Sequence, residues 1–501
     1  MIEVEELKLV IEPRISSVLD TVSNFLAEQD INSYIVGGFV RDVLLGRETA
    51  DIDIAVDADA LEVALKIAAI VGSIYVPLDD VNRVGRVVIV NEEAGATDNR
   101  LELDFSTLKG NIEQDLAQRD FTIDAIAINL KDLDKGELID PFNGWNDLRQ
   151  RVLRVVSETA LKSDAARLLR AVRLAAELDF GIDNETEPLI KRDSHLVSSV
   201  AGERIREELL RLIAIPRAGQ LLHYLDKLSL VTTTIPELAQ TKRVAQPKEH
   251  FWNVFDHSLR TVAAVDFLLR QGSWEYAREE VLTAVPWSAI LSQHFEQEVS
   301  RGSTRRSLLK LAALLHDIAK PQTKTIEADG RTRFLEHAKE GAAMATATME
   351  RLRFSTKEIK LVETVVRHHL RPGQMSNNGL PSRSAIYRYF RDTGEAGVDI
   401  LFLSLADHLA TRGPQLNLAQ WEEHVQTVEY VLARRLEQES ADVPSKLVDG
   451  HDLIDIFGMI PGPEIGELLE AMYEARAAGE LTTREEALAF LRERLSNKVG
   501  Q

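Results

Sequence analysis

Apolar and polar residues alternate in several short segments of the first 140 residues, whereas apolar residues take helical spacing almost everywhere after residue 149. Residues 1–30 have apolar side chains at helical spacing and predict an amphipathic helix that packs on the following sheet. The segments that predict strands are 34–36, 51–53, 75–77, 86–90 and 100–105. Strands gathered at one end of a chain and followed by helices predict an α+β protein whose first part holds a mixed sheet with helices.

A pair of glycines follows the first predicted strand. Gly37 and Gly38 form a turn without side chains, and residues 39–45 then fit a short helix that ends at Gly46. Bare backbone N–H groups at a helix N-terminus are suited to hold a triphosphate. Gly-Gly is also a common turn, so the pattern is informative only together with the residues that come next.

Two carboxylates come directly after this helix. Asp51 and Asp53 are two positions apart in a predicted strand, so both side chains face the same way. Glu102 and Asp104 alternate in the same manner in a later strand, and Asp104 either joins the first two as a third carboxylate or is an edge-strand charge. Parallel carboxylates beside a phosphate cradle predict Mg²⁺-dependent phosphoryl or nucleotidyl transfer.

Charged residues recur further along the chain. Arg119 and Asp120 precede an apolar run, and Asp164 and Arg167 are three apart, so we expect them on one helix face that Arg170 and Arg173 continue. Such an Asp–Arg pair is either an intrahelical salt bridge or an acceptor and donor array that reads a base edge.

A second group of polar residues, distant from one another in sequence, has the types of metal ligands. An adjacent His-Asp pair ends an apolar segment, and further histidines and an aspartate follow on predicted helices. This combination is typical of metal-dependent phosphate ester chemistry, with a transition metal such as Mn²⁺, Ni²⁺ or Zn²⁺. The residues are His257, His316, Asp317, His337, His369 and Asp407.

Composition limits the class of protein. The 501 residues are too many for one core, and three or four domains are expected. The absence of cysteine excludes disulfides and thiolate sites, and the sequence has neither a membrane-length apolar run nor a signal-peptide pattern, so we expect a cytoplasmic protein. The net charge of −21 disfavours nucleic acid binding, yet residues 149–173 form a local basic stripe that is either a solvated face or an RNA contact.

These motifs resemble those of the bacterial-type (class II) tRNA nucleotidyltransferases and their poly(A) polymerase relatives, in the polymerase-beta-like superfamily. The likeness rests on Gly37 to Asp42 with Asp51 to Asp53, on Arg119 to Ala125, and on Asp164 to Arg173. The His-Asp group is similar to the HD phosphohydrolase domain that many members carry. The resemblance implies a nucleotidyltransferase head at 1–148, a helical neck that recognises bases and RNA at 149–245, an HD domain at 246–430 and a helical tail at 431–501.

The resemblance also implies roles. Asp51 and Asp53, with Asp104 as a third carboxylate, would hold Mg²⁺, while Asp164 and Arg167 would select the incoming base. The remaining residues expected to bind the nucleotide are Gly37, Gly38, Arg41, Arg119, Asp120, Arg170 and Arg173. The implied reaction extends the 3′ end of tRNA from ATP, and from CTP as well. Residues 72–100 match the family's flexible loop region, which disfavours an enzyme that adds only CC but does not separate CCA addition from A addition.

Two departures from the family pattern bear on specificity: Ser163 stands where Glu is usual before the base-reading Asp, and Asp124 stands where Asn is frequent. The alternatives are a poly(A) polymerase acting on other RNA, a protein that is mainly an HD phosphohydrolase with an RNA-binding front half, and a non-catalytic scaffold. The intact Asp51, Asp53 and Arg41 disfavour the last two. The oligomeric state and the substrate of the HD domain do not follow from the sequence.

Overall fold

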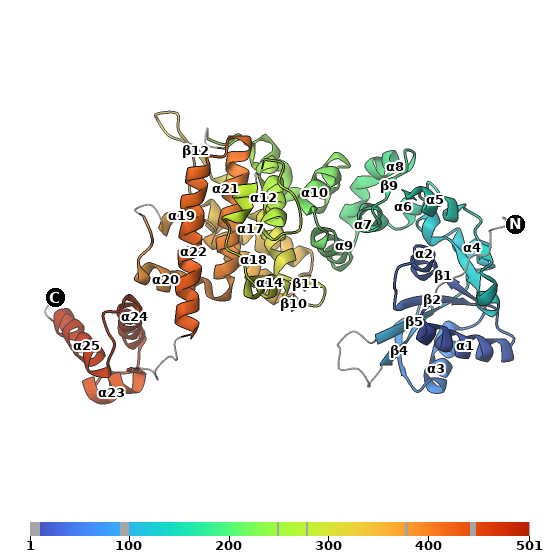
Figure 1. Cartoon of the computed structure of the whole chain (residues 1–501), viewed down its shortest axis with the longest axis horizontal. Coiled ribbons are helices and arrows are strands. Elements are labelled where there is room, and N and C mark those ends of the chain that lie inside the picture. Colours follow the sequence, from blue (N-terminus) through green and yellow to red (C-terminus); the bar gives the residue numbers. More distant parts are fainter. Residues whose placement is uncertain are drawn as a thin grey trace. The chain divides into compact units, whose positions relative to one another are not determined.

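The structure, a computed structural model, describes residues 11–90, 100–247, 250–276, 279–375, 379–440 and 447–499. The chain forms two compact units, one of Met1–Val200 with Lys227–Thr233 and one of Ala201–Asp226 with Thr234–Gln501 (Figure 1). Two of the expected boundaries, at 148 and 430, fall inside the helices α5 (Gly144–Gln150) and α22 (Leu418–Ser440) rather than in linkers. Within the described ranges, no helix combines the length and apolar composition that crossing a membrane requires.

The first unit contains a seven-stranded mixed sheet with the order β3-β4-β5-β2-β1-β6-β7. The β2–β5 pair is parallel and the other pairs in this sheet are antiparallel. The strands are β1 (Ser33–Val36), β2 (Asp51–Val56), β3 (Ile74–Asp79), β4 (Val84–Val90), β5 (Arg100–Thr107), β6 (Ala127–Asn129) and β7 (Leu138–Ile139). The expected mixed sheet is therefore confirmed.

Helices cover one face of this sheet. Helix α1 (Pro13–Glu28) buries Ile15, Leu19, Val22 and Leu26, which recur at helical spacing, and α3 (Ala60–Ile70) packs on β3, β4 and β5 (Figure 1). Gly85 of β4 shows how closely α3 approaches, because a Cβ atom there would lie 2.9 Å from the Cβ of Ala64.

The short helix α2 (Gly38–Leu44) lies between β1 and β2, as the sequence predicts. Gly37 has φ +72° and Gly46 has φ +67°, so both take the left-handed conformation that favours glycine, and Gly46 ends the helix in the expected C′ position. This turn brings the Gly37-Gly38 backbone to the end of β1, next to β2.

The rest of the first unit is mostly helical, and one small ladder joins β8 (Val152–Leu153) to β9 (Gly181–Ile182). Its helices are α4 (Ile112–Leu116), α5, α6 (Ala160–Ser163), α7 (Arg167–Leu178) and α8 (Thr186–Asp193). The segment expected to be the family's flexible loop, 72–100, is largely the β3–β4 hairpin. Only 91–99, expected to be a mobile turn, lies outside the described residues.

Over its described residues, the second unit has helices and two short ladders, β10 (Glu298–Ser300) with β11 (Ser303–Thr304) and β12 (Lys324–Ile326) with β13 (Thr332–Phe334). Five helices pack around its main core: α12 (Val254–Leu268), α15 (Arg305–Leu315), α17 (His337–Arg351), α18 (Thr356–His368) and α21 (Gly397–Arg412). Trp274 and Phe295, which lie between α12 and α15 in the sequence, are also buried in the second unit.

Additional helices complete the second unit. They include α9 (Gly202–Ala214), α10 (Ala218–Lys227), α14 (Ala289–Glu296), α16 (Lys320–Thr323), α19 (Arg371–Met375) and α20 (Arg383–Thr393). The last three helices, α23 (Gly450–Phe457), α24 (Pro463–Ala478) and α25 (Arg484–Val499), bury a small core of their own around Leu468, Met472 and Leu491. The helical tail expected from the sequence is therefore present.

Candidate functional site

Strand register places four carboxylates on one face of the sheet. Asp51 of β2 pairs with Glu102 of β5, and Asp53 pairs with Asp104. Residues paired across neighbouring strands point to the same face, and the strands lie about 4.8 Å apart. The structure therefore brings Asp104 beside Asp51 and Asp53, which is the first of the two arrangements that the sequence left open, and it adds Glu102.

This carboxylate face is only partly covered. Near β1 it packs against a small core that contains Val36, Ala55 and Leu116. Asp51, farther along β2, keeps a side chain that is 68% exposed, whereas those of Glu102 and Asp104 are nearly buried. The site thus has a packed wall on one side and is accessible at Asp51.

Arg86 of β4 lies against these carboxylates. Its Nε and Nη2 donate to the two oxygens of Asp104 at 2.6 and 2.7 Å, its Nη1 pairs with Glu102, and its Nη2 lies 4.0 Å from Asp51. The sequence placed Arg86 at the start of a predicted strand and gave it no role at the carboxylates. In the structure it compensates part of the negative charge that the four carboxylates concentrate.

Asp53 shows the effect of the negative charge that Arg86 does not compensate. Burial raises its pKa to about 6, and the negative charges of Asp51, Asp104 and Asp124 act in the same direction, while Arg119 opposes them. Burial and Asp104 also raise the pKa of Asp51. Two neighbouring carboxylates with raised pKa values, Asp51 and Asp53, fit a bound divalent cation, and an all-oxygen donor set suits Mg²⁺. Asp51, Asp53 and Asp104 are the residues that would hold it.

The glycine turn touches this group. A Cβ atom on Gly37 would lie 2.9 Å from Oδ2 of Asp53 and 3.2 Å from Nη1 of Arg119, so glycine is required both by φ and by space. The structure therefore brings Gly37, Arg119 and the carboxylates together, as expected of a phosphate-binding turn beside a metal site.

Arg41 and Asp120 are engaged by other side chains. Arg41 donates to both oxygens of Asp42 at 2.9 Å and to Oδ1 of Asp124 at 2.6 Å, and its side chain is nearly buried. Asp120 pairs with Arg170 at 2.9 Å. Burial raises the pKa of Asp124 even though Arg41 opposes this, and no residue that the structure describes forms a hydrogen bond with Oδ2 of Asp124. Arg41 is thus held in a buried ion cluster beside Gly38 of the glycine turn.

The expectation that Asp164 and Arg167 share one helix face is wrong. Helix α7 begins at Arg167, and Asp164 lies before it in extended conformation, where its Oδ1 accepts from the backbone N–H of Ala166. Aspartate competes with the helical backbone in this manner and favours such a position. The two side chains still lie 3.9 Å apart, and Arg167 donates to the carbonyl of Gln118, next to Arg119.

The basic stripe at 149–173 does not form a single solvent face. Arg173 is buried and pairs with Glu177 at 2.6 Å, and Arg154 pairs with Asp147 and Asp183. Arg149, Lys162 and Arg170 remain exposed. The stripe divides into structural ion pairs and a smaller set of accessible cations.

All six expected metal ligands of the second unit converge. His257 comes from α12, Asp407 from α21, His337 from the first turn of α17, and the remaining three residues follow the ends of α15 and α18. Nε2 of His257 lies 3.1 Å from Asp407, 3.2 Å from Nε2 of His316 and 3.5 Å from Asp317. Nε2 of His337 lies 3.5 Å from Asp317 and 3.3 Å from Nε2 of His369.

This His-Asp centre contains two possible ligand groups, His257 with His316 and Asp317, and Asp317 with His337 and His369. Asp317 belongs to both, through Oδ2 toward the first group and Oδ1 toward the second. The sequence predicted a transition metal among these six residues, and the geometry offers two ligand groups for it.

Hydrogen bonds and protonation both fit metal binding at this centre. Nδ1 of His316, His337 and His369 faces the backbone oxygens of Ala313, Phe334 and Val366 at 2.7–2.8 Å, which leaves each Nε2 directed at the centre. Burial lowers the pKa of His369 to about 3, helped by nearby His316. Burial favours protonation of Asp317 and Asp407, but the neighbouring histidines outweigh it and lower both pKa values. Ionised carboxylates and the neutral imidazoles of His337 and His369 are forms that bind cations, whereas Asp317 raises the pKa of His316 despite its burial, so a metal must displace the proton of His316.

Sequence reasoning missed two residues at this centre. Lys320 is buried and lies 2.7 Å from Oδ2 of Asp317, and His250 packs edge-on against His257 with ring centroids 5.7 Å apart. Burial lowers the pKa of His250 to about 4. The spacing of Lys320 from His316-Asp317, one helical turn, was the available signal, whereas nothing in the sequence singles out His250.

Models of known protein families match the segments that contain the carboxylate face and the His-Asp centre. Residues 33–154 match the family model "Poly A polymerase head domain", 179–241 match "Probable RNA and SrmB- binding site of polymerase A", and 254–412 match "HD domain". The A-adding tRNA nucleotidyltransferase of Deinococcus radiodurans is 33% identical over 463 residues, covering 91% of this chain and 94% of the relative. The chain belongs to the tRNA nucleotidyltransferase family.

A relative named for a different activity has the same sequence identity to this nucleotidyltransferase. The CC-adding tRNA nucleotidyltransferase of Thermus thermophilus is also 33% identical, covering 92% of this chain and 93% of its own. Among solved structures, a CCA-adding enzyme with ATP superposes with a TM-score of 0.64 at 22% identity, covering 97% of this chain and 96% of that one. The fold is thus that of the CCA-adding enzymes, and overall identity does not separate A addition from CC addition.

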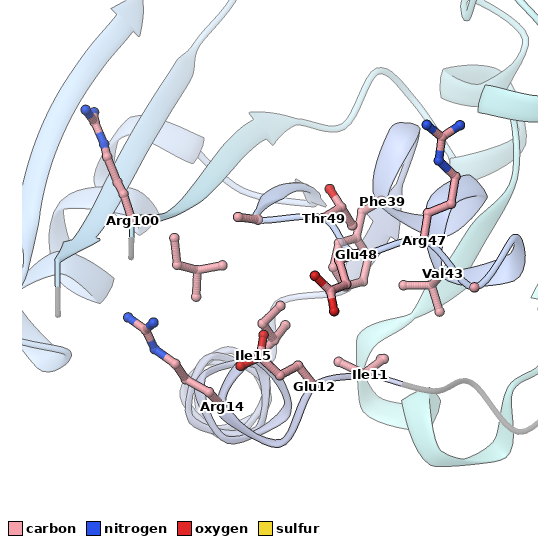
Figure 2. A pocket seen from close by; sticks show the side chains of 13 residues that line it. Ile11, Glu12, Arg14, Ile15, Phe39, Val43, Arg47, Glu48, Thr49 and Arg100 are labelled. Carbon is pink, nitrogen blue, oxygen red and sulfur yellow. The ribbon is translucent and has the colours of Figure 1, made fainter. Parts of the chain in front are cut away.

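A cavity of about 670 Å³ lies beside the nucleotidyltransferase head but not at its carboxylates. Figure 2 shows its lining, in which Ile15, Phe39 and Val43 form an apolar part and Arg14 and Arg100 lie at one end. Ala50 and Leu101 also line it, and they alternate along their strands with Asp51 and Glu102, so they point to the opposite face of the sheet. The cavity is therefore separate from the carboxylate face.

Gly37→Ala should lower both the free energy of unfolding and the incorporation rate of the nucleotidyltransferase. We expect about 1–2 kcal/mol of destabilisation from the left-handed backbone, and a further loss of kcat because the new Cβ atom displaces Asp53. Gly46→Ala is the matched control, since its φ is also positive but no described residue lies within 4 Å of a Cβ atom at this position. Equal incorporation rates for the two variants would contradict a role of Gly37 at the carboxylates.

Proposed function

We propose that this enzyme adds nucleotides to the 3′ end of tRNA without a template, using ATP and also CTP, at the carboxylate face of its head sheet. The single observation that carries the proposal is the register that places Asp51, Asp53 and Asp104 side by side next to the Gly37 turn. The names of the relatives, A-adding and CC-adding tRNA nucleotidyltransferases, support tRNA as the acceptor.

In the proposed reaction the 3′ hydroxyl of the RNA attacks the α-phosphorus of the nucleotide, a phosphodiester forms and pyrophosphate leaves. Asp51, Asp53 and Asp104 would hold Mg²⁺, which would supply positive charge to the transition state. The Gly37-Gly38 backbone allows the phosphates to approach, and Arg119, beside Asp53, offers a cation for them. Arg41, fixed by Asp42 and Asp124, adds positive charge from the side of α2.

A primer series tests this proposal. Purified enzyme is incubated in Mg²⁺ with tRNA ending before CCA, with tRNA ending in CC, or with an unrelated RNA, each with labelled ATP or CTP. Labelling of tRNA but not of the unrelated RNA is expected. Extension of the unrelated RNA by many adenylates would instead identify a poly(A) polymerase. Labelling from CTP on the first primer separates CCA addition from A addition.

Arg167 and Asp164 are proposed to read the incoming base. Arg167→Ala should reduce the discrimination of ATP from GTP and UTP, by on the order of 1–3 kcal/mol if two hydrogen bonds to the base edge are lost. The measurement is the ratio of kcat/KM values for the competing nucleotides. Arg149→Ala, which removes an exposed cation of α5, should weaken tRNA binding without changing that ratio. Unchanged selectivity in Arg167→Ala would leave the pair as an ion pair only.

The His-Asp centre supports a second function, hydrolysis of phosphate esters by a transition metal. Six converging imidazole and carboxylate groups favour Mn²⁺, Ni²⁺ or Zn²⁺ over Mg²⁺. We propose two metal positions that share Asp317, one toward His257 and His316 and one toward His337 and His369. Metal content per chain by elemental analysis tests this: close to two ions supports the shared carboxylate, and one ion supports a single site.

A further inference from the structure

Exposed aliphatic side chains lie on the same face of the head sheet as the catalytic carboxylates. Ile74 of β3 pairs with Val88 of β4, and Val76 pairs with Arg86. Val88 and Arg86 pair in turn with Glu102 and Asp104 of β5. Two continuous rows of side chains therefore cross the sheet on one face, and each runs from an aliphatic residue at the edge to a β2 carboxylate.

The two edge residues are not part of the core of the head. Ile74 is 59% exposed and Val76 is 36% exposed, and Leu78, the bulge residue that follows, is 46% exposed. The core lies on the other face, where Gly85 and Tyr75 pack toward α3. Neighbouring exposed aliphatic residues on one face of a strand are a feature of binding surfaces rather than of a solvated edge.

We infer that Ile74 and Val76 form a platform for the base of the nucleotide that precedes the 3′-terminal nucleotide of the RNA. This inference rests on the proposed function, because the 3′ hydroxyl must then lie at Asp53 and Asp104. Strand spacing puts β3 about 10 Å from β5 and about 14 Å from β2 on that face. The nucleotides immediately before the terminal one lie within this distance of the 3′ hydroxyl.

The chemistry of the platform suits a base rather than a phosphate. Aliphatic side chains offer no donor to a phosphate, but they cover the apolar face of any base, so binding tolerates different bases. Arg86 lies between the platform and the carboxylates, where the connecting RNA backbone would pass. A base placed there leaves the terminal ribose directed at the carboxylates.

Pairing of a second protein strand to β3 is the competing use of this edge. Pro77 lies within β3, and a bulge interrupts the register between Pro77 and Asp79. Both features protect edge strands against pairing with another strand. The observations therefore favour RNA as the occupant of this face.

The test compares two double variants of the full chain on tRNA ending in CC. Ile74→Ser with Val76→Ser should raise KM for the RNA by roughly five- to twentyfold, with KM for ATP and the melting temperature unchanged. Leu65→Ser with Ile70→Ser is the matched control, since both residues are exposed aliphatics of α3, on the other side of the sheet. The control should leave KM for the RNA unchanged.

A tRNA primer that lacks the base at its penultimate position completes a double-mutant cycle between protein and RNA. The parent should lose affinity for this primer by a similar factor, and the platform variant should lose little more, because the partner of the platform is already missing. A platform variant that behaves like the control, or that loses as much on the abasic primer as on the intact one, overturns the inference. A changed oligomeric state with unchanged RNA kinetics would overturn it in favour of a protein interface. If the parent extends no RNA, the proposed function itself fails.

Discussion

Asp53→Asn should lower nucleotide incorporation by roughly a thousandfold or more, because a lost metal ligand removes several kcal/mol of transition-state stabilisation. The amide keeps the size of the side chain but neither the charge nor the full ligand capacity of the carboxylate. The effect should appear in kcat with saturating RNA and nucleotide, measured in Mg²⁺. Activity within a few-fold of the parent would remove Asp53, and with it the carboxylate face, from the reaction.

The same substitution should not destabilise the metal-free protein at pH 7.5. Burial raises the pKa of Asp53 from 3.8 to about 6, so proton uptake stabilises the fold fully below pH 3.8, and that contribution is lost as the pH rises through 6. Asparagine removes this penalty, and the melting temperature of the variant should equal or exceed that of the parent at pH 7.5. The parent should also need more Mg²⁺ at pH 5.5 than at pH 7.5, because the proton competes with the cation.

His316→Ala with Asp317→Ala should abolish metal-dependent phosphate ester hydrolysis and leave Mg²⁺-dependent incorporation unchanged within a factor of about two, since the two ligand sets lie in different compact units. Binding of Mn²⁺ to the folded state should raise the melting temperature of the parent but not that of the variant. Hydrolysis with a generic phosphodiester and incorporation on tRNA are measured on the same preparation.

Structural damage is the competing outcome for this variant, because Lys320 would lose its buried partner Asp317. A control with the same substitutions, His451→Ala with Asp455→Ala, changes exposed residues of α23 and should leave both activities intact. If incorporation falls together with hydrolysis in a variant that melts like the parent, the two sites are not independent.

Local patterns were sufficient for much of the head. The alternation around Asp51 and Asp104 fixes which face each carboxylate occupies, and a glycine with positive φ was the expected end of α2 at Gly46. The resemblance of the motifs to one family predicted the order of the domains along the chain. Each of these signals depends on residues that are close in sequence.

Contacts between residues that are far apart in sequence could not be predicted from local patterns. The pairing of Arg86 with Asp104 depends on the register of β4 against β5, which follows from the whole sheet rather than from either strand. The position of Asp164 outside α7 depends on its own backbone hydrogen bond to Ala166, which helical spacing alone does not reveal. The sharing of Asp317 between two ligand groups depends on how five helices pack.

The length of the RNA product is the most direct test of the central claim, that the carboxylate face extends the 3′ end of tRNA. Parent enzyme is incubated in Mg²⁺ with tRNA ending in CC and ATP as the only nucleotide, and the product is resolved at single-nucleotide length. The account predicts tRNA that is longer by one adenylate with the parent and unextended tRNA with Asp53→Asn. Unextended tRNA with the parent, or extension that persists in Asp53→Asn, would contradict it.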